Sequence, residues 1–212
     1  MIDVYTIELG PLGTKAFLLF DESLKEAILI DAPQGSWKRI EPFLKQKNCR
    51  LSTLLLTHGH WDHIVDARAF QNAGARVYAH PNDRILIENP MTQAAFLNLQ
   101  IQLEAAQIDS ELTDGQILTL LGQSIEVRHV PGHCPGNVLF YFKALGWAFV
   151  GDVIFAGSIG RYDFPGCSKQ EIERSIKEKV YTLPGATTLC PGHGPLTTVE
   201  REKTTNPYVK PD

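Results

Sequence analysis

The residues best suited to chemistry lie in the stretch Thr57 to His63, which reads Thr-His-Gly-His-Trp-Asp-His. Positions 58 to 63 hold three imidazoles and one carboxylate, although the whole chain of 212 residues has only seven histidines. Neutral imidazole and carboxylate suit zinc, iron or manganese, whereas calcium and magnesium prefer shells of oxygen alone. The stretch therefore predicts a transition-metal site built on His58, His60, Asp62 and His63.

Three further candidate ligands lie far along the chain, each just after a predicted strand and beside Gly or Pro. They are His133 in Pro-Gly-His-Cys-Pro-Gly, Asp152 after Trp-Ala-Phe-Val-Gly, and His193 in Cys-Pro-Gly-His-Gly-Pro. Rigid α/β scaffolds place their sites on loops at strand ends, and Gly and Pro permit the sharp turns that this requires. We therefore expect the four ligand-bearing loops to converge.

The number of ligands decides the number of metal ions. Five histidines and two aspartates are too many for one catalytic zinc, which has about three protein ligands and an open water position. Two ions with three ligands each leave one group over, and a carboxylate can span two metals, so Asp152 or Asp62 should be the bridge. Two ions about 3.5–4 Å apart can share a hydroxide and clamp an electrophilic oxygen, which implies hydrolysis.

Some of these residues also have a structural interpretation. Asp62 could cap the helix that follows it, and His133 or His193 taken alone could be an ordinary loop histidine. Asp31, at a strand end, is either a hydrogen-bond partner of a ligand histidine or a turn residue. His80 and His129 are given only a structural role. Cys134, beside His133, could face the metals, but a packed thiol is favoured.

Hydrophobic periodicity predicts the elements that position the ligands. Strands are expected at residues 2–9, 15–20, 27–30, 51–56, 76–79, 116–120, 124–130, 138–142, 147–150 and 187–190. Helices are expected at residues 36–47, capped by Ser36, 64–72, 81–88, 91–99, and 168–180, capped by Ser168. Residues 97–103 alternate with period two and could equally be extended. The order strand, helix, strand predicts parallel crossovers in a mixed α/β sheet.

Length and composition favour one globular domain spanning residues 1–212, with 43% hydrophobic and 21% charged residues. The net charge of -4 and a pI near 6.0 argue against nucleic acid as a partner. Four scattered cysteines without a Cys-x-x-Cys pair favour reduced thiols in a cytoplasmic protein. The first residues predict a strand rather than a signal peptide, and no membrane association is expected.

The ligand pattern resembles the metallo-β-lactamase superfamily, whose His-x-His-x-Asp-His signature matches positions 58 to 63. Matches at the three later ligands extend the resemblance over nearly the whole chain. The family implies an α/β fold, a four-layer αββα sandwich with two mixed β-sheets and two divalent metals at one edge. Zinc is expected first, with iron or manganese as alternatives. The implied sharing of ligands is His58, His60 and His133 on the first metal, Asp62, His63 and His193 on the second, and Asp152 as the bridge.

Within the superfamily, residues 151–166 (Gly-Asp-Val-Ile-Phe-Ala-Gly-Ser-Ile-Gly-Arg-Tyr-Asp-Phe-Pro-Gly) are similar to short bacterial glyoxalase-II-like hydrolases, which cleave glutathione thioesters such as S-lactoylglutathione. The stretch 201–207 also resembles their C-terminus. The 19 residues after His193 leave no room for the helical glutathione-binding domain of full-length glyoxalase II. Specificity is therefore expected around Arg161 and the C-terminal loop. Candidate substrate contacts are Arg161, Tyr162, Arg201 and Lys203.

The resemblance implies a mechanism in which a metal-bridging hydroxide, oriented by Asp62 and Asp152, attacks the carbonyl of a small-molecule thioester. The thioester could carry glutathione. Arg161 could anchor a substrate carboxylate or instead pair with Asp163 at the surface. The oligomeric state is left open.

Other functions share much of this pattern. Persulfide dioxygenases have the same His-x-His-x-Asp-His stretch and a Gly-Arg-x-Asp-Phe element, but use one iron on residues matching His58, His133 and Asp152. A lactone or other ester hydrolase and a non-catalytic metal-binding regulatory protein are further alternatives. We favour a binuclear thioester hydrolase because Gly-Arg-Tyr-Asp-Phe-Pro-Gly is closer to the glyoxalase-like form and every ligand of the second metal is present.

Overall fold

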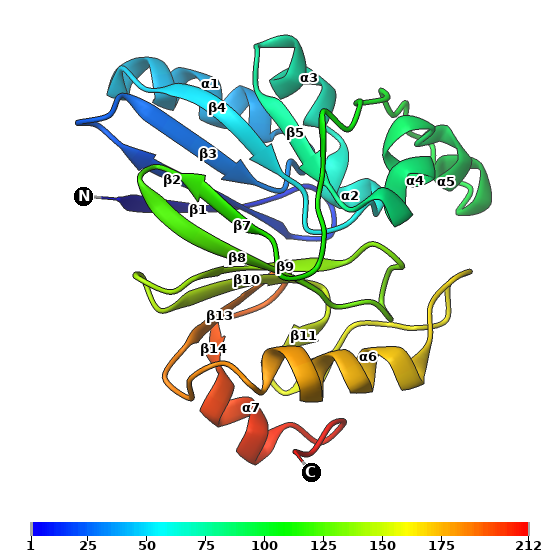
Figure 1. Cartoon of the computed structure of the whole chain (residues 1–212). Helices are drawn as coiled ribbons and strands as arrows, with labels where there is room; N and C mark the ends of the chain where they lie inside the picture. Colours follow the sequence, from blue (N-terminus) through cyan, green and yellow to red (C-terminus); the bar gives the residue numbers. More distant parts are fainter. Residues whose placement is uncertain (1, 212) are drawn as a thin grey trace. The chain divides into compact units, whose positions relative to one another are not determined.

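The computed structural model describes residues 2–211. These residues fall into two compact units that divide between Glu111 and Leu112. Each unit contains one six-stranded β-sheet with helices packed against it (Figure 1). Both sheets combine parallel and antiparallel pairs. The expectation of an α/β chain with two mixed sheets is therefore confirmed.

The sheet of the first unit follows chain order. Its strands are β1 (Asp3–Leu9), β2 (Thr14–Asp21), β3 (Glu26–Ile30), β4 (Arg50–Leu55), β5 (Arg76–Ala79) and β6 (Ser110–Glu111). The first three pair antiparallel through short turns, and β3 to β6 pair parallel. The predicted parallel crossovers are present because helical segments connect β3 to β4 and β4 to β5.

The helices of the first unit are α1 (Ser36–Lys47), α2 (Trp61–Ile64), α3 (Ala67–Asn72), η1 (Pro81–Asp83), α4 (Arg84–Glu88) and α5 (Met91–Phe96). Ile40 and Leu44 of α1 and Phe70 of α3 belong to the same buried core as the sheet. The core forms because the predicted apolar stripes of these helices face the sheet.

Three predictions for these helices were wrong in detail. Gly35, at a φ of 90°, is the N-cap of α1, and Ser36 lies inside the helix. The single helix expected at 64–72 is interrupted at Asp66, whose carboxylate accepts from Ser36 Oγ and Trp37 N. Residues 97–109 form neither helix nor strand: α5 stops at Phe96 because Asn98 adopts a left-handed conformation that ends the helix.

The sheet of the second unit runs in the order β14-β13-β10-β9-β8-β7, with only β10 and β13 paired in parallel. Its strands are β7 (Ile117–Leu120), β8 (Gln123–His129), β9 (Val138–Phe142), β10 (Trp147–Gly151), β13 (Thr188–Pro191) and β14 (Thr197–Thr198). A separate small hairpin joins β11 (Ile154–Phe155) and β12 (Ser158–Ile159). The short strands β6, β11, β12 and β14 were not predicted.

Two helical segments pack on this second sheet (Figure 1). As predicted, Ser168 caps α6 (Lys169–Ser175) by accepting from Glu171 N, and the helix continues as the π-helical turn η2 (Ile176–Val180). The expectation of a C-terminal loop was wrong, because α7 (Val199–Thr205) forms there. Thr198 caps α7 by accepting from Arg201 N, a signal that the sequence contains.

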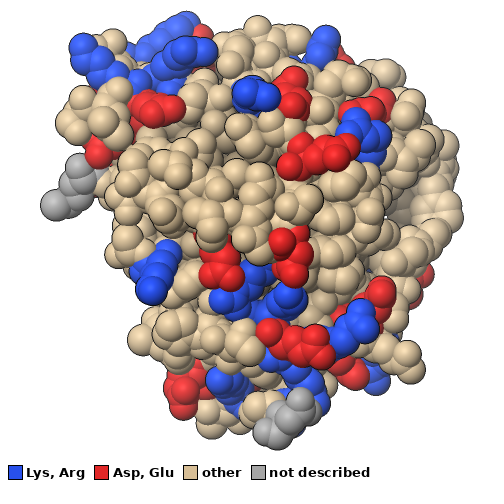
Figure 2. Space-filling view, in the orientation of Figure 1, with Lys and Arg blue, Asp and Glu red and all other residues tan. Residues whose placement is uncertain are grey.

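Surface charges are mixed. On the face drawn in Figure 2, Lys and Arg side chains lie beside Asp and Glu side chains. Ion pairs of opposite charge include Lys179 with Asp114 and Arg128 with Glu126. None of the helices in residues 2–211 combines the length and the apolar character that crossing a membrane requires.

Glu202 of α7 is fully buried, and its carboxylate ties three segments of the second unit together. It accepts hydrogen bonds from Gly157 N in the turn of the β11–β12 hairpin, from Thr197 Oγ1 in β14 and from Asn206 Nδ2. A buried charge is tolerated only with such partners. α7 therefore fixes both the hairpin and β14.

We expect Glu202→Ala to lower the free energy of unfolding by about 3 kcal/mol, because two buried donors and one part-buried donor lose a charged acceptor. Urea denaturation followed by circular dichroism would measure the loss. The exposed neighbour Glu200 is the control, and Glu200→Ala should change the free energy of unfolding by less than about 0.5 kcal/mol. Equal effects of the two variants would contradict the role given to Glu202.

Candidate metal centre

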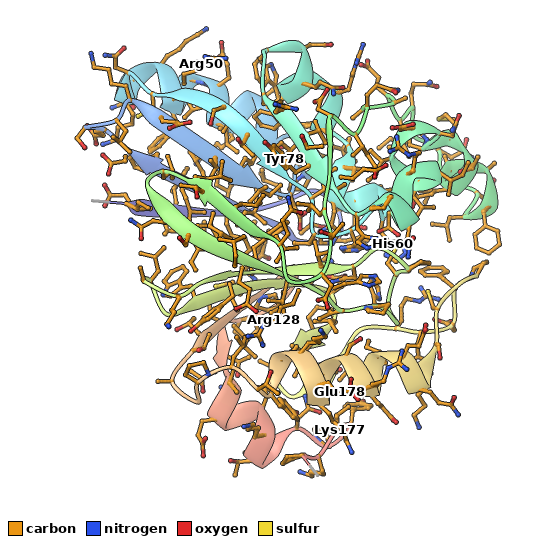
Figure 3. All side chains as sticks on the ribbon, in the orientation of Figure 1. Arg50, His60, Tyr78, Arg128, Lys177 and Glu178 are labelled. Carbon is orange, nitrogen blue, oxygen red and sulfur yellow. The ribbon has the colours of Figure 1, made fainter. Side chains whose placement is uncertain are left out.

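The first unit supplies four of the predicted ligands from one short segment after β4. His58 and His60 lie in the loop, and Asp62 and His63 in the first turn of α2. A ligand atom of His58 lies within 4.8 Å of one of His60 and within 4.8 Å of one of His63. His63 Nε2 lies 3.5 Å from Asp62 Oδ2. His60 is half-buried and labelled in Figure 3, whereas the other three side chains are buried.

The capping interpretation of Asp62 was wrong. Asp62 lies inside α2, whose N-cap is His60. Its Oδ2 instead accepts a hydrogen bond of 2.7 Å from Thr14 Oγ1 at the start of β2. No local sequence pattern predicts this contact, because Thr14 is 48 positions away from Asp62.

Asp31 holds the end of β4 and the start of α2 together. Its carboxylate accepts hydrogen bonds from Thr57 N (2.8 Å), Thr57 Oγ1 (2.7 Å) and His63 Nδ1 (2.8 Å), and Asp31 is only 2% exposed. The interpretation of Asp31 as a partner of a ligand histidine is therefore supported. Because Nδ1 of His63 carries the donated proton, Nε2 is its ligand atom.

The same reasoning assigns the ligand atom of His58. Thr57 Oγ1 donates its one proton to Asp31, so it accepts from His58 Nδ1, 3.0 Å away. His58 therefore also presents Nε2. Between His58 and His60, Gly59 is required sterically, because a Cβ there would lie 2.8 Å from Leu86 Cβ.

The second unit brings its three predicted ligands together from three different strand ends. His133 follows β8, Asp152 follows β10 and His193 follows β13. Asp152 Oδ2 lies 3.6 Å from His133 Nε2 and 3.3 Å from His193 Nε2. His133 and Asp152 are buried, and the side chain of His193 is 25% exposed. One carboxylate oxygen thus lies close to both imidazoles.

The backbone after Asp152 orients His133. His133 Nδ1 donates a hydrogen bond of 2.8 Å to the carbonyl of Arg161, which again leaves Nε2 as the ligand atom. Gly160 makes this close approach possible, since a Cβ there would lie 1.9 Å from Asp152 O and 2.9 Å from His133 Nδ1. The loop of residues 160–161 is therefore packed directly on two predicted ligands.

The predicted ion pair between Arg161 and Asp163 is present. Arg161 donates from Nε and Nη2 to the two carboxylate oxygens of Asp163, each at 2.8 Å, and its guanidinium lies 3.9 Å from the ring centre of Phe164. The hydrogen bond from Arg161 holds the pKa of Asp163 below its usual range. Tyr162 is 39% exposed. Whether Arg161 and Tyr162 contact substrate stays a prediction.

The remaining candidates have local roles. Arg201 is exposed and Lys203 half-buried on α7. Hydrogen bonds to the β11–β12 hairpin come instead from Glu202 of α7 and from its C-cap, Asn206. Three residues given a structural role behave accordingly: His80 accepts from Asn82 N, His129 Nε2 donates to Pro135 O, and Cys134 is fully buried.

The donor chemistry fits divalent metal ions. In each unit, imidazole Nε2 atoms and a carboxylate oxygen lie close together, and protein groups fix Nδ1 of His58, His63 and His133. Such a hydrogen bond on the far nitrogen sets both the tautomer and the ring orientation of a metal-binding histidine.

Comparison with known proteins identifies the family. The family model described as the metallo-β-lactamase superfamily matches residues 9–193, a range that includes all seven predicted ligands. The chain belongs to this superfamily and has its fold, as predicted.

Two curated relatives and two solved structures illustrate the range of the family. Hydroxyacylglutathione hydrolase GloC of Haemophilus influenzae is 36% identical over 200 residues, 91% of each chain. Persulfide dioxygenase ETHE1 of Homo sapiens is 32% identical over 92% of this chain and 71% of its own. The crystal structure of BLEG-1 B3 metallo-β-lactamase has a TM-score of 0.89 at 35% identity and covers 99% of both chains. TTHA1623, in a di-iron-bound form, has a TM-score of 0.84 at 35% identity and covers 97% of this chain and 100% of its own. The family and its relatives indicate a metal-dependent hydrolase.

We expect Asp31→Asn to weaken metal binding by about 10- to 100-fold, because His63 loses the anionic acceptor of its Nδ1 proton. Asparagine tolerates the left-handed conformation of position 31, which has a φ of 59°. Competition with a chromophoric chelator would measure the affinity.

Asp21→Asn is the matched control, because Asp21 is also a buried aspartate but serves a turn by accepting from Ser23. That variant should bind metal like the wild type. Unchanged affinity in Asp31→Asn would show that the contact with His63 does not support the metal site.

Proposed function

We propose that the two units form one domain, residues 1–212, in which their ligands combine into one binuclear centre. His58, His60 and His133 would hold the first metal, and Asp62, His63 and His193 the second, with Asp152 between them. The ions are two divalent metals, zinc in the first place, with iron or manganese as alternatives. The position of Asp152 Oδ2 carries this proposal, because it lies 3.6 Å and 3.3 Å from two imidazoles assigned to different metals.

We propose that this centre hydrolyses small-molecule thioesters, including glutathione-linked ones such as S-lactoylglutathione. Support comes from the relative named hydroxyacylglutathione hydrolase, 36% identical over 91% of the chain, and from the glyoxalase-like segment 151–166. When bound, two divalent ions would lower the pKa of water towards ~7 and polarise the thioester carbonyl. The scattered cysteines favour a cytoplasmic location.

The chain's own carboxylates would then position the attacking water. Asp62, held by Thr14, and Asp152 accept its hydrogen bonds and orient it towards the carbonyl carbon. Addition of the water to the carbonyl carbon is followed by cleavage of the carbon–sulfur bond. One thioester and one water thus yield a carboxylic acid and a thiol, the sulfur taking up the second proton of the water. No serine or cysteine nucleophile is needed in this scheme.

A second candidate function follows from the similarity to the human persulfide dioxygenase, 32% identical over 92% of this chain. In that function one iron would use the residues His58, His133 and Asp152. The two candidates predict different metal stoichiometry and different co-substrates, because only the dioxygenase consumes oxygen.

We expect the purified protein to contain two metal ions per chain and to release thiol from S-lactoylglutathione. Metal content would be measured by mass spectrometry, and oxygen uptake with glutathione persulfide would be measured in parallel. Cleavage of a chromogenic cephalosporin would be tested as well, given the similarity to BLEG-1. A single iron with oxygen uptake, or cephalosporin cleavage without thiol release, would contradict the proposal.

The variant Asp152→Ala serves as the internal check of this assay. Loss of the bridge should lower metal content and thiol release together, with kcat/KM reduced at least about 100-fold. Asp114→Ala, which removes an exposed carboxylate of the same unit, should leave both unchanged. Full activity and full metal content in Asp152→Ala would refute the bridging assignment.

We expect Arg161→Ala to raise KM for S-lactoylglutathione about 10-fold with little change in kcat, because one charge-assisted hydrogen bond to a substrate carboxylate is lost. The ion pair with Asp163 uses Nε and Nη2, and Nη1 carries further donors. A thioester without a carboxylate, S-acetylmercaptoethanol, should be cleaved equally by wild type and variant.

Asp163→Asn is the matched control for Arg161, because it removes the ion pair and keeps the guanidinium. Its KM should not rise above that of the wild type. If KM for S-lactoylglutathione is unchanged in Arg161→Ala, then Arg161 serves only the surface pair.

A further inference from the structure

One buried side chain holds the backbone on both sides of His60. Gln93 of α5 is 6% exposed. Its Nε2 donates a hydrogen bond of 2.8 Å to Gly59 O, and its Oε1 accepts one of 3.0 Å from Trp61 N. The Gly59 carbonyl belongs to the peptide plane before His60, and the Trp61 N–H belongs to the plane after it. A single carboxamide therefore fixes both planes that flank this predicted ligand.

The orientation of the Gln93 carboxamide is determined by its partners. Nε2 donates its second proton to Leu86 O at 3.0 Å, so both of its protons face carbonyl oxygens and its oxygen faces an N–H. The flipped amide would place like groups together at all three contacts. The side chain therefore fits this position in one way only.

The helices η1 and α4 also hold the loop that contains Gly59 and His60. Asp83, fully buried, accepts a hydrogen bond of 2.8 Å from Gly59 N. The Cβ position of Gly59 would lie within 3.0 Å of Asp83 Cβ and 2.8 Å of Leu86 Cβ, which shows how closely η1 and α4 pack on the loop. Figure 3 labels His60 at the end of the first unit where α2 and α4 lie.

The histidines of this segment are thus oriented in two different ways. His58 and His63 are held through their rings, by Thr57 and Asp31. The ring of His60 lies edge-on to that of His58, at 4.8 Å between ring centres, and Gln93 in addition holds the backbone of His60 and so the direction of its Cα–Cβ bond. Less conformational freedom then has to be lost when the imidazole binds a metal ion.

We propose that Gln93 is a positioning residue for the first metal of the centre, acting through the backbone of His60. The inference rests on the proposed binuclear assignment, in which His60 is a ligand. In this proposal Gln93 acts through the two peptide planes beside His60 and does not bind the metal itself. Its loss should weaken the binding of one ion and leave the other ion bound normally.

The test compares Gln93→Met with Gln71→Met. Methionine keeps the length of the side chain and removes its hydrogen bonds. Gln71 of α3 is the matched control, because its carboxamide also holds a backbone at two points, with Nε2 donating to Gln107 O (2.9 Å) and Oε1 accepting from Gln107 N (3.0 Å). The Gln71 contact involves none of the predicted ligands.

Zn²⁺ alone is the probe, titrated into metal-free protein in competition with a chelator. One of the two zinc dissociation constants should rise about 10-fold or more in Gln93→Met, in the range typical for lost partners of metal ligands, and neither should change in Gln71→Met. Unfolding of the metal-free proteins in urea separates this effect from a general loss of stability.

Unchanged zinc affinity in Gln93→Met overturns the proposal, even if its metal-free form is less stable. If Gln93→Met does not fold, Gln93→Asn replaces it, because the shorter carboxamide cannot reach both peptide planes. Wild-type protein that binds zinc in a Gln93-dependent way but releases no thiol would refute the thioesterase function and leave this inference standing. The proposal is also overturned if the wild-type protein binds only one zinc ion and Gln93→Met binds that ion with the same affinity.

Discussion

The predicted ligands of the first unit depend on the hydrogen bond between Asp31 and His63. A buried carboxylate must be satisfied by donors, and Asp31 finds three, two on Thr57 and one on His63. These donors belong to different elements, the end of β4 and helix α2, while Asp31 itself follows β3. Its backbone N–H donates to Leu55 O, so the parallel pairing of β3 with β4 places the carboxylate. The sheet therefore fixes the tautomer of a ligand.

In the second unit a backbone carbonyl, rather than a carboxylate, fixes the tautomer of a predicted ligand histidine. The Arg161 carbonyl replaces a carboxylate as the acceptor for His133 Nδ1, and the missing side chain of Gly160 lets the loop approach. Two groups of Arg161 therefore have separate roles. Its carbonyl orients a ligand, and its guanidinium, paired with Asp163, is the predicted substrate contact. A change in the loop backbone would disturb metal binding and substrate binding together.

Much of this architecture could be predicted from the sequence, because strands and ligand types leave local signals. Apolar runs located the ten main strands, and residue type together with position after a strand located the candidate ligands. Contacts between distant residues left no such signal. Thr14 and Gln93 are ordinary residues in the sequence, and their roles depend on pairings 48 and 34 positions apart. The break near Asp66 has the same cause, since Asp66 is held by the start of α1. Helix α7 was missed although Thr198 marked its start.

Ligand identity alone does not separate a hydrolase from an iron dioxygenase in this superfamily, so the groups that hold the ligands have to decide. Asp62 and His63, both assigned to the second metal, are buried and held by Thr14 and Asp31. Thr14 and Asp31 orient these two side chains through hydrogen bonds of 2.7 and 2.8 Å. Because hydrogen bonds already orient Asp62 and His63, these side chains would lose less conformational entropy on binding a metal ion. Buried hydrogen bonds thus orient two residues that a single iron would not use, and this supports our proposal of two ions.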